Sequence, residues 1–301
     1  MSGQDQGYHS GFVGVVGRPN VGKSTIVNRF VGSKVAIVSP RPQTPRQRIL
    51  GILTREDTQV AFLDTPGWHE PRHMLGRAMM AVVKTVMEEA DVLLVVIDGR
   101  AGLLKEDEYI FAHVKRTRRP SILAINKIDV VKKPHLLPLI DTCAKTGLFS
   151  DCVPVSALTG EQMEVLLARL ITHLPTGPRW YEATQRTDQP IAQQVGELIR
   201  EQILLAAREE VPHAVAVAIE EFAERRRVSF IRATILVERT GQKAILIGRG
   251  GEKLKAIGQA ARAEIERLLG RQVYLDLWVK VKPAWRQDPR LLRELGYVPS
   301  A

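Results

Sequence analysis

The sequence is poor in cysteine and has no long apolar run, and both absences limit what the protein can be. Its two cysteines, Cys143 and Cys152, fit neither a zinc ligand pair nor a redox C-x-x-C motif. Thiols of this kind suit a reducing cytoplasm. The longest obvious apolar run, Val92 to Ile97, is far too short to span a bilayer, and the first residues have no apolar signal core. We therefore expect a cytoplasmic protein.

Length and charge set two further expectations. A chain of 301 residues is long for one hydrophobic core, so two domains are expected. No internal repeat is apparent. The formal net charge is +10 and the isoelectric point is about 9.8. Such a charge favours an anionic partner, either nucleic acid or an acidic membrane surface, although generic basicity explains the charge equally well.

A glycine-rich loop near the N-terminus gives the first chemical indication. It fits the phosphate-binding pattern G-x-x-x-x-G-K-S/T, and it lies between a predicted buried strand and a predicted helix. The backbone N–H groups of such a loop and the helix N-terminus face phosphate oxygens. Lys23 is expected to reach the β- and γ-phosphates, and the Ser24 hydroxyl to ligate Mg²⁺. The loop consists of Gly17, Arg18, Pro19, Asn20, Val21, Gly22, Lys23 and Ser24.

A second element of the same site follows about forty residues later. Residues 49–53 and 60–63 are predicted to be strands, and the second of them ends at Asp64. An aspartate in this place can hold Mg²⁺ through a water, and Gly67 can turn its N–H toward the γ-phosphate. Before these strands, the proline-rich residues 39–48 are predicted to form a loop that is ordered by what it binds. The element consists of Asp64, Thr65, Pro66, Gly67 and Trp68.

Two later strand ends carry residues that fit a guanine base. Residues 121–125 are predicted to form a strand that opens into Asn126, Lys127, Ile128 and Asp129. The Asp129 carboxylate can accept hydrogen bonds from the N1–H and the exocyclic amine of guanine, a donor pair that adenine lacks. The backbone of Ser156, Ala157 and Leu158 can contact the base oxygen. The alternation of strands and helices predicts an α/β fold with a doubly wound parallel sheet.

The second half of the chain predicts a separate module that binds single-stranded nucleic acid. Residues 175–190 are rich in turn formers and are expected to link a domain of residues 1–174 to one of residues 191–301. In the latter we predict a helix, two strands, a helix–loop–helix and a last strand. The loop has the Gly-x-x-Gly form that lets a nucleic-acid backbone approach, and it clamps about four nucleotides in KH domains. The candidate residues for contact with the nucleic acid, which the family resemblance below implies to be RNA, are Gly248, Arg249, Gly250, Gly251, Lys253 and Lys255.

Taken together, these motifs resemble the Era family of GTPases over roughly residues 10 to 298, with a type II KH arrangement in the second half. The resemblance implies GTP hydrolysis with Mg²⁺ held by Ser24, Thr44 and Asp64. It also implies a potassium ion near Asn20 that acts as a positive charge, with simple capping of the loop by Asn20 as the equal alternative. The residues implied to act in catalysis are Asn20, Lys23, Thr44 and Gly67.

The resemblance also implies biological partners. These are the single-stranded 3′ end of small-subunit (16S) ribosomal RNA, the small ribosomal subunit during its assembly, and peripheral contact with the cytoplasmic face of the inner membrane, with the protein a monomer. Trp68 stands where Ras-like GTPases carry the glutamine that orients water.

One departure from the family pattern is Pro45, where a second threonine is usual. Proline has neither a hydroxyl nor an N–H, so it can neither ligate the metal by its side chain nor donate to a phosphate. We expect slower hydrolysis as a result. The alternatives are a GTP-dependent RNA-binding factor that hydrolyses weakly or not at all, and a GTPase whose KH-like fold binds protein. An ATPase is disfavoured by Asp129.

Overall fold

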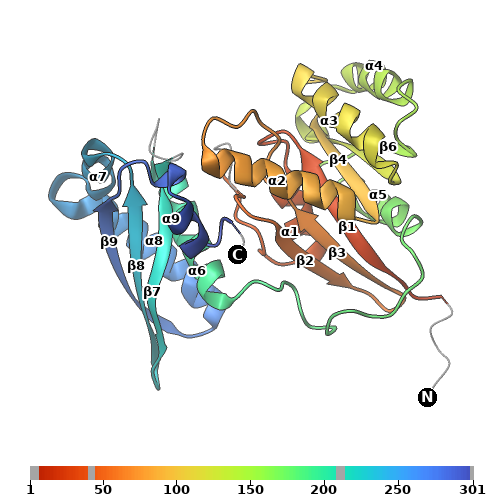
Figure 1. Cartoon of the computed structure of the whole chain (residues 1–301). Coiled ribbons are helices and arrows are strands. Elements are labelled where there is room, and N and C mark those ends of the chain that lie inside the picture. Colours follow the sequence, from red (N-terminus) through yellow and green to blue (C-terminus); the bar gives the residue numbers. More distant parts are fainter. Residues whose placement is uncertain (1–6, 40–44, 208–213, 299–301) are drawn as a thin grey trace. The chain divides into compact units, whose positions relative to one another are not determined.

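The computed structural model describes residues 7–39, 45–207 and 214–298. The chain folds into two compact units, with the main division between Asp188 and Gln189. Figure 1 labels most of the helices and strands of each unit. No helix in these three ranges is both long and apolar enough to cross a membrane.

The first unit is built on a six-stranded sheet in the order β2-β3-β1-β4-β5-β6. All neighbouring strands are parallel except β2 and β3, which are joined by a short turn and therefore run antiparallel. The predicted doubly wound α/β fold is thus confirmed, with one antiparallel strand at an edge. Its elements are β1 (His9–Gly17), α1 (Lys23–Val31), β2 (Ile49–Thr54), β3 (Thr58–Asp64), α2 (Met74–Glu89), β4 (Val92–Asp98), α3 (Lys105–Thr117), β5 (Ser121–Asn126), η1 (Ile128–Val130), α4 (Lys133–Ala144), β6 (Asp151–Pro154) and α5 (Met163–Ile171).

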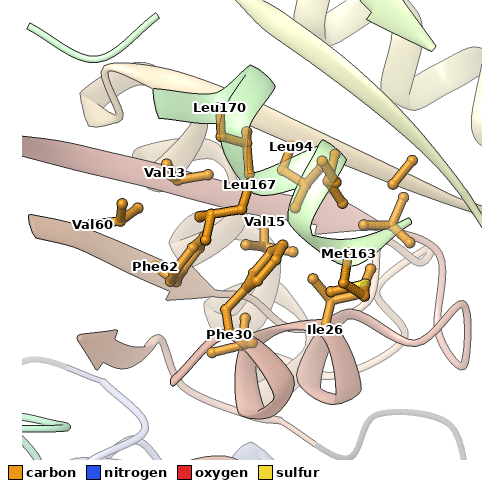
Figure 2. Close-up of a cluster of buried hydrophobic side chains, with 14 of the residues drawn as sticks. Val13, Val15, Ile26, Phe30, Val60, Phe62, Leu94, Met163, Leu167 and Leu170 are labelled. Carbon is orange, nitrogen blue, oxygen red and sulfur yellow. The ribbon is translucent and has the colours of Figure 1, made fainter. Parts of the chain in front are cut away.

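Helices cover both faces of this sheet, because the central strand β4 is apolar and buried without interruption from Val92 to Ile97. On one face, β4 residues such as Leu94 pack with α1 and α5 (Figure 2), and Phe30 stacks on Phe62 with ring centroids 5.0 Å apart. On the other face, Leu93 and its alternate neighbours pack with α2, α3 and α4. The double layer fixes the carboxyl ends of β1, β3, β4 and β5 at one edge, where the predicted nucleotide residues lie.

The segment predicted as a linker is hydrogen-bonded to the first unit along most of its length. The N–H groups of Trp180 and Tyr181 donate to the Gln59 side chain at 2.8 and 3.0 Å. Ile52 N–H donates to the Arg186 carbonyl at 2.8 Å, so the segment covers the open edge of β2. The boundaries at 174 and 191 stay predictions.

The second unit has a three-stranded sheet in the order β7-β8-β9, with β7 and β8 antiparallel and β8 and β9 parallel. The long helices α6 and α8 pack on each other and on this sheet. This order of helix, two strands, helix–loop–helix and strand is the predicted one. The elements are α6 (Ile191–Ala206), β7 (Ala216–Glu224), β8 (Val228–Val237), α7 (Thr240–Ile247), η3 (Arg249–Gly251), α8 (Glu252–Leu269), β9 (Gln272–Val281), η4 (Trp285–Gln287) and α9 (Pro289–Glu294).

Candidate nucleotide site and nucleic-acid interface

The phosphate loop connects β1 to α1, and its two chemically active side chains lie at the start of the helix. The Lys23 ammonium donates to the carbonyls of Gly17 and Arg18 at 3.1 and 2.9 Å, so it lies across the mouth of the loop. The Ser24 hydroxyl donates to Asp64 Oδ2 at 2.6 Å, which brings together residues 40 positions apart. The two predicted phosphate elements therefore form one site.

Burial perturbs the charged groups of this site strongly. Desolvation lowers the pKa of Lys23 to about 8, although the nearby Asp64 carboxylate opposes the shift. Desolvation likewise raises the pKa of Asp64 to about 6, against the attraction of Lys23 and the hydrogen bonds from Ser24 and the backbone of Thr65. Two such shifts in adjacent buried groups are characteristic of a functional site.

The oxygen atoms beside Ser24 fit a magnesium ion. Asp64 Oδ1 is buried and accepts no hydrogen bond from any residue that the structure describes. A buried carboxylate oxygen without a hydrogen-bond donor destabilises the folded protein unless a cation or water binds it. Together with the Ser24 hydroxyl it offers the hard oxygen ligands that Mg²⁺ prefers. The third predicted ligand, Thr44, lies outside the described residues, whereas its neighbour Pro45 is buried.

Two positions in this site must be glycine, because neighbouring residues approach their backbone closely. Gly67 packs against Pro19, where an added Cβ would lie 2.6 Å from the Pro19 Cα atom. Gly22 caps α1 with φ 101°, and an added Cβ would collide with the side-chain amide of Asn126. Trp68, after Gly67, donates its N–H to the Gly17 carbonyl at 3.0 Å. Both glycines thus let the segments of the site touch.

Asn126, the last residue of β5, ties three of the predicted segments together, as the sequence suggested. Its Nδ2 donates to the Val21 carbonyl at 2.8 Å, and its Oδ1 accepts from the Ala157 N–H at 3.0 Å. Both bonds are buried, so they are strong and costly to break. The base-recognition loops are therefore held in register with the phosphate loop.

Lys127 makes a second bridge to the phosphate loop, and it uses a residue that the sequence analysis missed. Its ammonium donates to the Asn20 carbonyl and to Asp98 Oδ2, both at 2.6 Å. The hydrogen bond and charge of Lys127, with two backbone N–H bonds, hold the pKa of Asp98 below its usual value although burial opposes the shift. The only signal for Asp98 in the sequence is that it ends a buried strand.

Asp129 is exposed and oriented, as base recognition requires. The buried Ser156 hydroxyl donates to Asp129 Oδ1 at 2.6 Å, and Thr159 N–H donates to the Ser156 oxygen at 3.1 Å. The carboxylate is therefore anchored on one oxygen. Leu158 is 76% exposed, and its backbone carbonyl accepts a hydrogen bond from the Arg29 side chain at 3.0 Å.

Arg18 and Asp107 form a further link that the sequence did not reveal. Arg18 Nε donates to Asp107 Oδ1 at 2.8 Å, and Asp107 is fully buried at the start of α3. Asp107 Oδ2 also accepts the Leu104 N–H at 3.0 Å, which satisfies the first turn of α3. Desolvation raises the pKa of Asp107, against the hydrogen bond from Arg18. The pair attaches the phosphate loop to a neighbouring helix.

In the second unit, the predicted RNA-binding loop joins α7 to α8 beside a groove. Gly248, Gly250 and Gly251 all have positive φ, and Arg249 and Gly250 are exposed. The groove has a volume of about 470 Å³. Of the predicted residues it includes Gly251 and Lys255, while Lys253 lies in the first turn of α8. It further includes Gly258, Gln259, Arg262 and Tyr274.

The α8 groove residues could have been found from sequence, because they recur every three or four positions and so share one helix face. Lys255 and Arg262 give that face positive charge, as contact with phosphates requires. Tyr274 could not have been found in this way, since it comes from β9.

Comparison with known proteins agrees with both modules predicted from the sequence. The family described as 50S ribosome-binding GTPase matches residues 12–127, and the KH domain family matches residues 210–286. The structure of Era in complex with MgGDPNP and nucleotides 1506–1542 of 16S ribosomal RNA has 41% sequence identity and a TM-score of 0.94, covering 97% of this chain and 99% of that one. A point variant of Aquifex aeolicus Era bound to GDP·AlF4⁻ has the same identity and TM-score, covering 96% of this chain and 99% of the other. By this likeness over nearly its whole length, the chain belongs to the Era family of GTPases.

Proposed function

We propose that this GTPase binds GTP with Mg²⁺, hydrolyses it, and binds the single-stranded 3′ end of 16S ribosomal RNA during assembly of the small ribosomal subunit. The observation that carries the nucleotide part is the pair of buried Asn126 hydrogen bonds, which join the phosphate loop to both base-recognition loops. The RNA part is supported by the Gly-x-x-Gly loop beside a basic groove and by the related complex with 16S ribosomal RNA.

In the proposed mechanism, each group stabilises negative charge on the triphosphate. Mg²⁺ held by Ser24 and Asp64 would neutralise charge on the β- and γ-phosphates. The chain itself supplies Lys23, the backbone N–H groups of the loop and the N-terminus of α1. Because these donors are buried and fixed, they need little reorganisation during hydrolysis. Asp129 selects guanine, and Ser156 positions its carboxylate.

A non-hydrolysing factor is not favoured as an alternative, because a family member was crystallised with GDP·AlF4⁻, a mimic of the hydrolytic transition state. The description of the first family names the 50S subunit. The 16S complex nevertheless carries the proposal, since its likeness covers 97% of this chain.

The nucleotide part is tested by isothermal titration calorimetry with GTP, GDP and ATP in the presence of Mg²⁺. We expect GTP and GDP to bind and ATP to show no measurable heat. Equal binding of ATP and GTP, or binding of neither, would contradict the role assigned to Asp129.

The RNA part is tested with Gly250→Asp. This position suits a charge reversal because its φ is 60°, which Asp tolerates better than most residues, and an added Cβ meets nothing within 4 Å. Gly248 is unsuitable, since a Cβ there would lie 2.7 Å from Lys253. We expect binding of an RNA with the 16S 3′-end sequence to be lost and GTP binding to stay. Loss of both, or of neither, would contradict the separation into two sites.

Four finer points belong to the same proposal, and all but the first rest on the family resemblance. RNA binding is proposed to raise GTP turnover, because one chain carries both sites. A potassium ion is proposed near Asn20. The protein is proposed to act as a monomer in the cytoplasm, with peripheral contact to the inner membrane. GTPase assays with and without K⁺ and the RNA, and sedimentation of the protein alone and with acidic vesicles, test these points.

A further inference from the structure

The sheet of the second unit carries large aromatic side chains on the face that α8 does not cover. Along β9, Leu277 lies against Gly258 of α8, and its odd-numbered neighbours Val273 and Val279 are buried. Successive strand residues point to opposite faces, so Tyr274 and Trp278 lie on the other side. Tyr274 is 60% exposed and Trp278 is 61% exposed.

Tyr274 stacks on Phe230 of the neighbouring strand, and Trp278 follows four residues later on the same face of β9. Phe230 pairs with Tyr274 in the β8–β9 register, and their rings stack with centroids 5.5 Å apart and planes 9° apart. The Arg225 and Arg232 guanidinium groups lie 5.1 and 5.3 Å from the centroid of the Phe230 ring. We call Phe230, Tyr274 and Trp278 the aromatic face.

The charges around the aromatic face leave an excess of cations. The carboxylates of Asp276 and Glu221 pair with Arg232 at 3.0 and 3.4 Å, and Glu224 pairs with Arg271 at 3.2 Å. A fourth carboxylate, Glu220, accepts a hydrogen bond from the Thr234 hydroxyl. By contrast, Arg226 and Arg227 at the β7–β8 turn and Lys280 on β9 form no ion pair with any residue described in the structure. Exposed aromatic rings flanked by unpaired cations are the features with which proteins bind single-stranded nucleic acid.

The aromatic face is continuous with the groove beside the Gly-x-x-Gly loop. Tyr274 lines that groove and also stacks on Phe230. Since β9 is the edge strand of its sheet in the described part of the chain, no other described strand separates the groove from the aromatic face. We propose that RNA leaving the groove passes over β9 and stacks its next bases on the aromatic face, which is thus a second contact for single-stranded RNA. This inference rests on the proposed RNA binding by the groove.

The test compares two unstructured RNAs, one of about four nucleotides, which the groove alone accommodates, and one of about twelve. Affinities of the full-length protein are measured by fluorescence anisotropy for Trp278→Ala, Trp278→Phe and a control, Tyr109→Ala. Tyr109 suits as control because it is 52% exposed and lies on α3 of the first unit. We expect Trp278→Ala to lower the affinity for the long RNA about tenfold or more, which is the effect of losing a stacked base. Its affinity for the short RNA should be unchanged. Trp278→Phe should restore most of the affinity, and Tyr109→Ala should bind both RNAs normally.

Other outcomes separate this inference from the groove itself. If Trp278→Ala binds the long RNA as tightly as the parent while Gly250→Asp binds neither RNA, the groove stands and the aromatic face is refuted. An equal loss of affinity for both RNAs in Trp278→Ala also refutes the aromatic face as a separate contact, because the substitution would then have damaged the groove. If Gly250→Asp keeps both affinities, the groove assignment fails. A concentration-dependent dimer in sedimentation that Trp278→Ala abolishes would assign the face to a second copy of the chain instead.

Discussion

Replacing Asp64 by asparagine is expected to make the nucleotide-free protein more stable while destroying its activity. Asp64 is fully buried, and its pKa is raised to about 6 from 3.8, chiefly by desolvation. Its ionised form is therefore penalised in the folded state. Asparagine has nearly the same shape, retains an oxygen that accepts from Ser24, and carries no charge. It cannot supply the anionic oxygens that hold Mg²⁺.

The size and the pH dependence of the expected gain in stability follow from the linkage between protonation of Asp64 and folding. Between about pH 4 and pH 6 the folded protein binds more protons at Asp64 than the unfolded chain does, so stability falls as pH rises through this window. A shift of roughly two pKa units corresponds to a penalty of about 3 kcal/mol above pH 6. At pH 5 about half of this penalty is present. Lys23, with a pKa of about 8, stays mostly protonated at both pH 5 and pH 7.

Differential scanning calorimetry with a chelator and without nucleotide measures the effect. The transition of the nucleotide unit is identified as the one that GDP raises in the parent protein. At pH 7 we expect Asp64→Asn to raise this transition by about 6–12 °C, and at pH 5 by about half as much. Mg²⁺-dependent GTP turnover should fall to background. A transition that is unchanged or lowered at pH 7, or raised equally at both pH values, would refute the reasoning.

Four further predictions concern other contacts of the nucleotide unit. Asp129→Asn should weaken GTP binding in calorimetry by about 100-fold or more, because charge-assisted bonds to the base are lost; an unchanged affinity would remove Asp129 from the site. Asp107→Ala should destabilise the nucleotide unit by about 3–5 kcal/mol in scanning calorimetry, since it leaves Arg18 partly buried without its carboxylate partner. Adding Arg18→Met to this variant should recover part of the lost stability, and no recovery would argue against the Arg18–Asp107 ion pair. Pro45→Thr should raise GTP turnover with little change in GTP affinity, and an equal rate would show that the missing hydroxyl is irrelevant. Replacing K⁺ by Na⁺ should slow turnover in the parent but not in Asn20→Ala, whereas equal rates in both salts would leave Asn20 a purely structural role.

Much of the nucleotide site could be predicted because its residues occur in short runs with fixed spacing. The phosphate loop must sit between a strand and a helix, and apolar patterning marks both elements without any long-range information. The same holds for the Gly-x-x-Gly loop, whose glycines have positive φ in the structure. The antiparallel direction of β2 likewise follows from the short turn before β3.

The supporting contacts could not be predicted, because they join residues far apart in the chain. Arg18 and Asp107 are 89 positions apart, and Lys127 and Asp98 are 29 apart. No local pattern distinguishes these aspartates from the many that merely face solvent. The segment before Asp188 likewise looked like a free linker, since its polar, turn-rich composition does not show that its backbone bonds to Gln59 and β2.

The sequence by itself determined the fold class of both units, the order of the nucleotide elements and the Gly-x-x-Gly form of the loop between α7 and α8. These features are local, and each depends on residues within about one strand or helix of one another. Only the tertiary structure decided which carboxylates are buried, and hence which pKa values are shifted, because desolvation depends on every element packed around a group. It also decided that Tyr274 and Trp278 are exposed on an uncovered sheet face, since strand alternation assigns two faces but only packing shows which of them α8 covers.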